Sequence, residues 1–141
     1  MDGISVTTHW HGDNDDRFGG FGAIWRHDIE NDKVVSRLKL FDGLARNPVL
    51  APDGKQVAFV TRENKVCVMD INGGKSRVVA EANGEACLDW PCVQWLYYSK
   101  GGYNQPEESR NLHRVNPESG KDEHIVKWVS GIWRFGVSAD L

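Results

Sequence analysis

The sequence of 141 residues lacks an apolar run of membrane-spanning length, and no stretch of it has a convincing helical period. A transmembrane helix needs about 20 consecutive apolar residues, so no membrane contact of this kind is predicted. The net charge is also small, because the sequence has 17 Lys and Arg residues and 20 Asp and Glu residues. Without a basic stripe, a nucleic-acid partner is disfavoured.

A signal peptide is also missing, because the N-terminus has no charged segment followed by an apolar one. We therefore expect a cytoplasmic protein if the chain is complete, and a periplasmic or secreted one if it is a mature fragment. No nucleophile elbow, triad order or phosphate loop occurs, so the sequence leans against an enzyme without settling the question.

Cysteine is rare, with three residues in all. Cys67 lies within a predicted strand and is expected to be a small buried hydrophobic residue. Cys87 and Cys92 flank a predicted tight turn, where a hairpin disulfide is the alternative to two thiols. The spacing of the three fits no common zinc pattern.

What the chain does contain is a repeat, seen best in Leu50 to Lys75. A turn signal is followed there by an alternating strand, a short polar loop, a second strand and a Gly-Gly turn. The segments that align are 50–61 with 88–99 and with the chain end at 137–141, and 24–33 with 66–75 and 112–121. A period of about 40 residues built from short strands is typical of a β-propeller blade.

The strands are nearly apolar on both faces, as expected when blades stack on each other. Val57 and Phe59 face one way, and Ala58 and Val60 face the other. The predicted strands, counted from the innermost, are 47–51, 86–89 and 133–138 (first), 4–8, 56–61 and 93–99 (second), 23–29, 65–71 and 110–116 (third), and 34–40, 76–80 and 123–128 (fourth).

These strands predict one all-β domain, 1–141, made of three four-stranded antiparallel blades. Blade one covers 2–40, blade two 44–80 and blade three 85–128, and blade one lacks a first strand. Three blades are too few to close a ring, since closed propellers have about 4 to 8. An open arc would expose two apolar blade faces and a strand edge.

A head-to-tail homodimer would solve this problem by making six blades around a two-fold axis. Residues 133–138 of each copy would then supply the first strand of the partner's blade one, in trans, beside Ile4 to Thr8. The alternative is that the chain is a fragment of a longer propeller.

The runs Pro52 to Val60 and Met69 to Gly74 resemble the repeat of TolB-like β-propellers, also called WD40-like or PD40 repeats. The family pattern is approximately SPDGKxIAFxS followed by a strand ending in MDxDGG. Blade three departs from it at Trp90-Pro91-Cys92. Such propellers are often six-bladed, and members include periplasmic scaffold proteins, gating domains of serine peptidases and polysaccharide lyases. No catalytic motif of these members is matched, so the resemblance implies a fold and no reaction.

Binding is expected on the rim that carries the loops between second and third strands. Two of these loops are long, 9–22 and 100–109, whereas the third is only 62–64. Long loops on a rigid scaffold are where binding residues concentrate. We therefore expect a non-enzymatic scaffold that recognises a peptide, a protein or a glycan there.

The first long loop also carries candidate metal ligands, His9, His11 and Asp13, because imidazole and carboxylate suit a divalent metal. With Asp15 and Asp16, the carboxylates of this loop would alternatively supply oxygen ligands to calcium, although the calcium-loop pattern is incomplete. A solvated loop whose Asp residues make turns is the plainer interpretation, with no cofactor at all. The alternative function is a metal-assisted carbohydrate lyase or hydrolase that uses His9, His11 and Asp13.

The remaining candidates near this rim are aromatic or cationic. Trp10, Tyr103 and Trp133 would form a platform for a sugar or a peptide, or would pack into the core or an interface. Arg46 and Arg134 stand at the start of inner strands, where they would bind a carboxylate or pair with a nearby acid.

Overall fold

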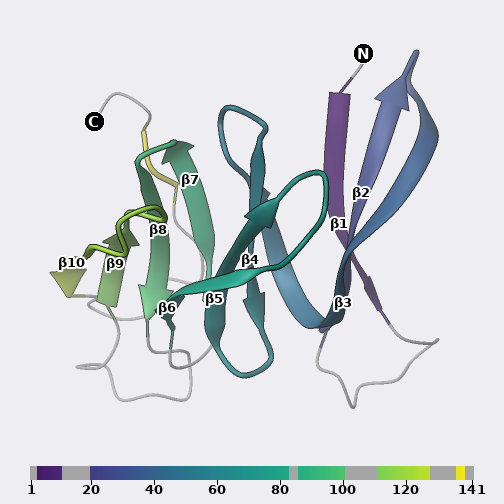
Figure 1. Ribbon diagram of the computed structural model, residues 1–141. Coiled ribbons are helices and arrows are strands. Elements are labelled where there is room, and N and C mark those ends of the chain that lie inside the picture. The colour runs from purple at the N-terminus through teal and green to yellow at the C-terminus, as the bar shows by residue number, and fades with distance from the viewer. Residues whose placement is uncertain (1–2, 11–19, 83–85, 101–110, 128–135, 139–141) are drawn as a thin grey trace.

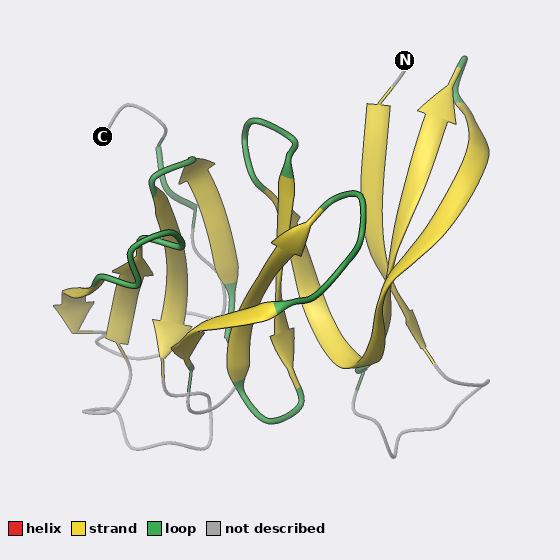
Figure 2. Cartoon of the chain, viewed as in Figure 1, coloured by secondary structure: helices red, strands yellow, loops and turns green. Residues whose placement is uncertain are grey.

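The structure is a computed structural model that describes residues 3–10, 20–82, 86–100, 111–127 and 136–138. This described part forms ten antiparallel strands in two sheets and contains no helix, so none that could span a membrane (Figure 2). The strands are β1 (Gly3–Trp10), β2 (Gly22–Glu30), β3 (Lys33–Leu50), β4 (Gln56–Thr61), β5 (Lys65–Asp70), β6 (Arg77–Glu81), β7 (Leu88–Cys92), β8 (Trp95–Lys100), β9 (Asn111–Val115) and β10 (Asp122–Lys127).

The larger sheet has the order β1-β2-β3-β4-β5-β6, and the smaller has the order β10-β9-β8-β7. β3 is 18 residues long and bends, so that its first part pairs with β2 and its second part with β4 (Figure 1). The strands therefore group into three stacked units. Unit one is β1, β2 and residues 33–41; unit two is residues 45–50 with β4, β5 and β6; unit three is β7 to β10.

The core lies on both faces of unit two. The unit 1–2 cluster consists of Ile24, Leu40, Ala45, Val57, Phe59, Cys67, Met69 and Ile71. The unit 2–3 cluster consists of Ala51, Ala58, Val60, Val66, Val68, Ala82, Ala86, Trp90, Leu96, Tyr98 and Val115. Along β4 the alternate residues enter different clusters, which confirms the prediction that Val57 and Phe59 face away from Ala58 and Val60.

Two predicted strands, 34–40 and 47–51, are joined in one continuous strand, β3. The other predicted strands agree with the observed ones within three residues at each end, with one exception. The exception is 133–138, of which 133–135 lie outside the described residues and 136–138 form no strand. The backbone N–H of Val137 donates to Asp89 Oδ2 at 2.6 Å, so this segment lies against β7.

In unit three the predicted alignment was wrong by one residue. β7 continues to Cys92 and a two-residue turn follows, so β8 begins at Trp95. Leu96 pairs with Val115 and packs on unit two, which makes it the counterpart of Val57 rather than of Ala58. The alignment assumed a turn as long as the one that follows Ala51, and a slip of one residue exchanges the two faces of a strand.

The outward faces of the end units are polar and aromatic, whereas the sequence predicted apolar ones. On unit one, Thr7 Oγ1 lies 2.9 Å from His27 Nε2, and Lys39 Nζ lies 5.3 Å from the centroid of the Trp25 ring. Among the positions that alternate toward unit two, Ile4, Val6 and Ile24 are apolar and pack in the unit 1–2 cluster, while Arg26 bonds to the Ile71 carbonyl. The outward-facing positions of unit one are not covered by any described segment of unit two or three. Polar side chains can therefore lie there without being buried by a neighbouring unit.

The cysteines behave in two ways. Cys67 is 4% exposed within the unit 1–2 cluster, which confirms the predicted buried position. Cys87 and Cys92 are half-buried thiols in the structure, and the described residues contain no disulfide.

Candidate functional site: a charged depression on one rim

The candidate site lies at the end of the stack where β1, β4, β6 and β8 end (the lower end in Figure 1). The strand ends that flank both long loops are at this rim, as is the short turn that joins β4 to β5. Residues 11–19 and 101–110 of the long loops lie outside the described residues. The described part of this rim therefore consists of the strand ends and the short turn.

The turn between β4 and β5 is fixed by three backbone hydrogen bonds. The N–H of Asn64 donates to the Thr61 carbonyl at 2.9 Å, and the Asn64 carbonyl accepts from the N–H of Ala82 at 2.8 Å. The N–H of Arg62 donates to the Leu44 carbonyl at 2.9 Å. Asn64 has a φ of 63°, a left-handed conformation that Asn tolerates better than most residues. The side chains of the turn are thus held at a defined place between units two and three.

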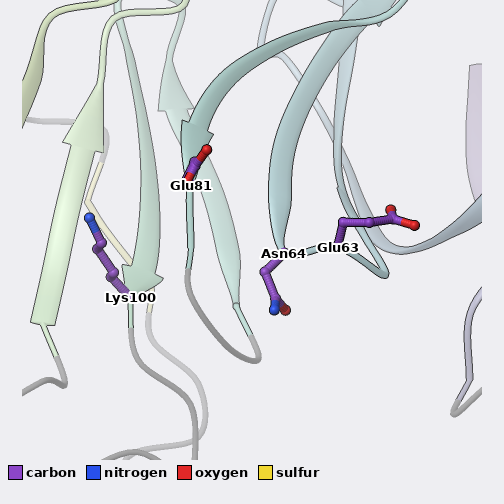
Figure 3. A pocket seen from close by; sticks show the side chains of 4 residues that line it. All are labelled: Glu63, Asn64, Glu81 and Lys100. Carbon is purple, nitrogen blue, oxygen red and sulfur yellow. The ribbon is translucent and has the colours of Figure 1, made fainter.

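These side chains line an open depression of about 240 Å³ together with residues from two other strands. Glu63 and Asn64 come from the turn, Glu81 from the end of β6 and Lys100 from the end of β8. Figure 3 shows the four side chains around it. The depression therefore brings together units two and three, which are joined in the sequence by residues 82–87.

The depression carries charge of both signs. The Lys65 ammonium donates a hydrogen bond to the Glu81 carboxylate, and this bond is the main cause that lowers the pKa of Glu81. The positive charge of Lys100 lowers the pKa of Glu81 further. Glu81 consequently stays a carboxylate at neutral pH, beside the Lys100 ammonium and the exposed Glu63.

Among the predicted site residues, Arg46 is described in full. It lies on β3, opposite Val60, and its guanidinium carbon is 4.3 Å from the centroid of the Phe21 ring. This is a cation–π contact. It places Arg46 at the beginning of β2, near the same rim.

The other predicted residues are described partly or not at all. The backbones of His9 and Trp10 continue β1, opposite Ala23 and Gly22, but their side chains are not described. The rest lie outside the described residues: His11, Asp13, Asp15, Asp16, Tyr103, Trp133 and Arg134. The metal site of His9, His11 and Asp13 therefore stays a prediction. Within the described ranges, no group of three or more His, Cys, Asp or Glu residues could hold a metal ion.

Sequence reasoning did not find the residues that line the depression. Glu63 and Asn64 belong to the short loop 62–64, and Lys100 begins the long loop 100–109; the sequence placed both loops on this rim, but none of these three residues was among the candidates. Glu81 is the last residue of β6, the fourth strand of its repeat, and the sequence of one repeat does not indicate that it belongs to a site. The signal that could have found the site is the junction of two units, where the end of β6 meets the end of β8.

The fold is similar to that of TolB from Acinetobacter baumannii, with a TM-score of 0.55 and 25% sequence identity. The match covers 76% of this chain but only 27% of that chain. No protein-family model matches the chain, and no curated protein matches it. The resemblance to TolB-like propellers is thus confirmed for the architecture, and the chain has a TolB-like all-β fold.

Proposed function

We propose that this chain is a non-enzymatic binding module whose ligand surface is the rim that carries the depression. The observation that supports it most is the junction itself, where Glu63, Asn64, Glu81 and Lys100 line one open depression between two packed units. A rigid scaffold with polar groups at one end is suited to present them to a ligand without first ordering them. The flanking long loops, 9–22 and 100–109, would enlarge this surface.

The ligand that fits best is a peptide or protein segment with charged side chains of both signs. Two carboxylates and one ammonium line the depression, and each would pair with an opposite charge. A neutral glycan would leave these charges without an ionic partner. Among the three ligand classes expected from the sequence, the charges therefore favour a peptide or a protein.

We also propose that the three units are propeller blades, 2–40, 44–80 and 85–128, and that two copies of the chain close a six-bladed ring. The stacking of units one, two and three supports this arrangement, because each junction buries one face of both neighbours. β1 is the edge of the larger sheet. In the proposed ring, residues 133–138 of the second copy pair with that edge.

The binding proposal is tested with an array of synthetic peptides that differ in charge, and with a glycan array in parallel. Peptides that carry Lys or Arg together with Asp or Glu should be retained, and fluorescence anisotropy then gives Kd. The variants Glu63→Lys and Lys100→Glu should each raise Kd by about tenfold or more. Lys55→Glu is the matched control, since Lys55 is exposed on the turn before β4, at the opposite end of the stack.

Two results would count against the proposal. Rim variants that bind the peptides as well as the unchanged chain would place the ligand elsewhere. Retention of neutral glycans alone would overturn the ligand class. The ring is tested separately by light scattering, which should give a mass near twice 15.9 kDa; a monomer at all concentrations would overturn it.

A further inference from the structure

Arginine side chains cross both junctions between the units. From unit one, Arg26 Nη1 donates to the Ile71 carbonyl at 3.0 Å and to Asn72 Oδ1 at 3.0 Å. From unit two, Arg77 Nη1 donates to the Pro117 carbonyl in unit three. In each case an arginine of the preceding unit binds the turn that follows the third strand of the next unit.

The two carbonyl groups that accept these bonds occupy the same place in the repeat. Ile71 is the sixth residue of 66–75, and Pro117 is the sixth residue of 112–121. The third copy of this segment is 24–33, in which Ile29 is sixth and Glu30 is seventh. Ile29 is on the outward face of unit one, directly opposite Gly3, and Glu30 is exposed.

An arginine in the place of Arg26 is present on the outward face of unit three. Arg26 is the third residue of 24–33, and Arg114 is the third residue of 112–121. Both are held by an acid of their own unit: Arg26 Nε lies 2.7 Å from Asp28 Oδ1, and Arg114 Nε lies 2.8 Å from Glu123 Oε2.

Two aromatic residues of the same face also hold Arg114. Its guanidinium carbon is 4.1 Å from the centroid of the Trp95 ring, and its Nη1 donates to the Tyr97 hydroxyl at 3.3 Å. A guanidinium fixed in this way loses little further freedom when it binds a second group. Arg114 is therefore presented outward in an ordered position, with donors to spare.

We propose that Arg114 of one copy binds Ile29 and Glu30, at the end of β2, in a second copy, as Arg26 binds the Ile71–Asn72 turn within one chain. This inference rests on the proposed six-bladed ring and names the contact that would join its halves. Glu30 takes the place of Asn72, so the contact gains an ion pair between guanidinium and carboxylate where the internal junction has a neutral amide acceptor. The polar and aromatic outward faces suit an interface between chains that meet water when they are apart.

A double-mutant cycle tests the contact on the 141-residue chain by sedimentation equilibrium. The variants are Glu30→Gln, Arg114→Met and the double variant, where Met keeps an apolar stem over Trp95. Each single change should raise the dimer Kd by about tenfold or more. The double variant should be no weaker than Arg114→Met alone, because its partner is already gone. Lys55→Gln, which also removes one charge from an exposed residue outside both contacts, should leave the dimer Kd unchanged.

The outcomes separate this inference from the ring. A dimer whose Kd is unaffected by either single change overturns the Arg114 contact and leaves the ring standing. Effects that simply add in the double variant also overturn a direct contact. A chain that is monomeric throughout overturns both. Should Arg114→Met fail to fold, Glu30→Gln carries the test alone, since Glu30 is exposed at the end of β2.

Discussion

Units one and two place different chemistry at equivalent positions of the same strand pair. Phe59 pairs with Cys67 in unit two, and these residues are 0% and 4% exposed. Thr7 pairs with Trp25 in unit one, and both are half-buried. The position of a unit in the stack, rather than its strand geometry, therefore decides whether its alternate residues must be apolar.

The physical reason is that unit two has a neighbour on each side. The β4 side chains from Val57 to Val60 each enter one cluster or the other, so a polar group at these positions would lose water without gaining a partner. Unit one has a described neighbour on one side, and its opposite face carries the Thr7–His27 pair. The comparison predicts that equal substitutions have unequal effects in the two units.

The largest difference is expected between Phe59→Ala and Thr7→Ala. Phe59 is fully buried and its ring centroid is 4.7 Å from that of Phe41, so its loss opens a cavity that costs about 3–5 kcal/mol. Thr7→Ala removes one half-buried hydrogen bond, worth about 1 kcal/mol. Urea unfolding at one fixed protein concentration measures both. Equal costs would contradict the distinction between the two faces.

The same comparison explains which features of the fold could be predicted from the sequence. Strand positions and the two faces of β4 follow from local alternation, which each repeat carries within itself. The register of unit three depends on whether the turn before β8 has two residues or more. Trp90-Pro91-Cys92 gives no sign that β7 continues through it, so the faces of Leu96 and Tyr97 were exchanged.

The candidate site was harder to predict, because the depression is formed where two units meet. Glu81 is 17 positions after Asn64, and Lys100 is 19 positions after Glu81, so the site residues are distant in the sequence. The rim itself follows from the loop lengths, but Glu81 and its partner Lys65 become neighbours of Lys100 only through packing. A single repeat contains no signal for a contact of this kind.

A second prediction concerns the junction that unit one does form. Arg26→Met keeps the length of the side chain but removes its bonds to Asp28, to the Ile71 carbonyl and to Asn72. Hydrogen bonds of a charged group contribute about 1.5–3 kcal/mol, and we expect a loss of that size. Differential scanning calorimetry should show a lowered Tm. The control is Arg62→Met, on an exposed turn residue, which should leave Tm nearly unchanged.

A third prediction uses the alkaline behaviour of unit two. Burial in the unit 1–2 cluster is the main cause that raises the pKa of Cys67 from 9.0 to about 11, with the charge of Glu63 second. The unfolded chain therefore loses this proton first. The contribution of the protonated Cys67 thiol to the free energy of unfolding is fully present below pH 9. It falls as the pH rises toward 11, by roughly 2 kcal/mol at pH 11.

The measurement is the free energy of unfolding against pH for the unchanged chain and for Cys67→Ala. The variant should lose less stability between pH 9 and 11. Parallel slopes would show that the thiol is not shielded by the cluster. Thiol labelling gives a second readout, since Cys87 and Cys92 are half-buried and should react before Cys67.

The smallest effect is expected for Tyr98→Phe, which gives unit three the residue that unit two has at the equivalent position. The Tyr98 hydroxyl donates to Asp122 Oδ2, while Asp122 Oδ1 lies 3.0 Å from His113 Nδ1. The variant keeps the buried ring and leaves Asp122 with His113, so the loss should be about 1 kcal/mol at pH 7.

Burial, followed by the bond to Asp122, raises the pKa of Tyr98. The contribution of the hydroxyl is thus fully present below pH 10 and falls above it, and Tyr98→Phe should flatten that fall. A variant as costly as Phe59→Ala would mean that unit three depends on this hydroxyl more than on the packing it shares with unit two.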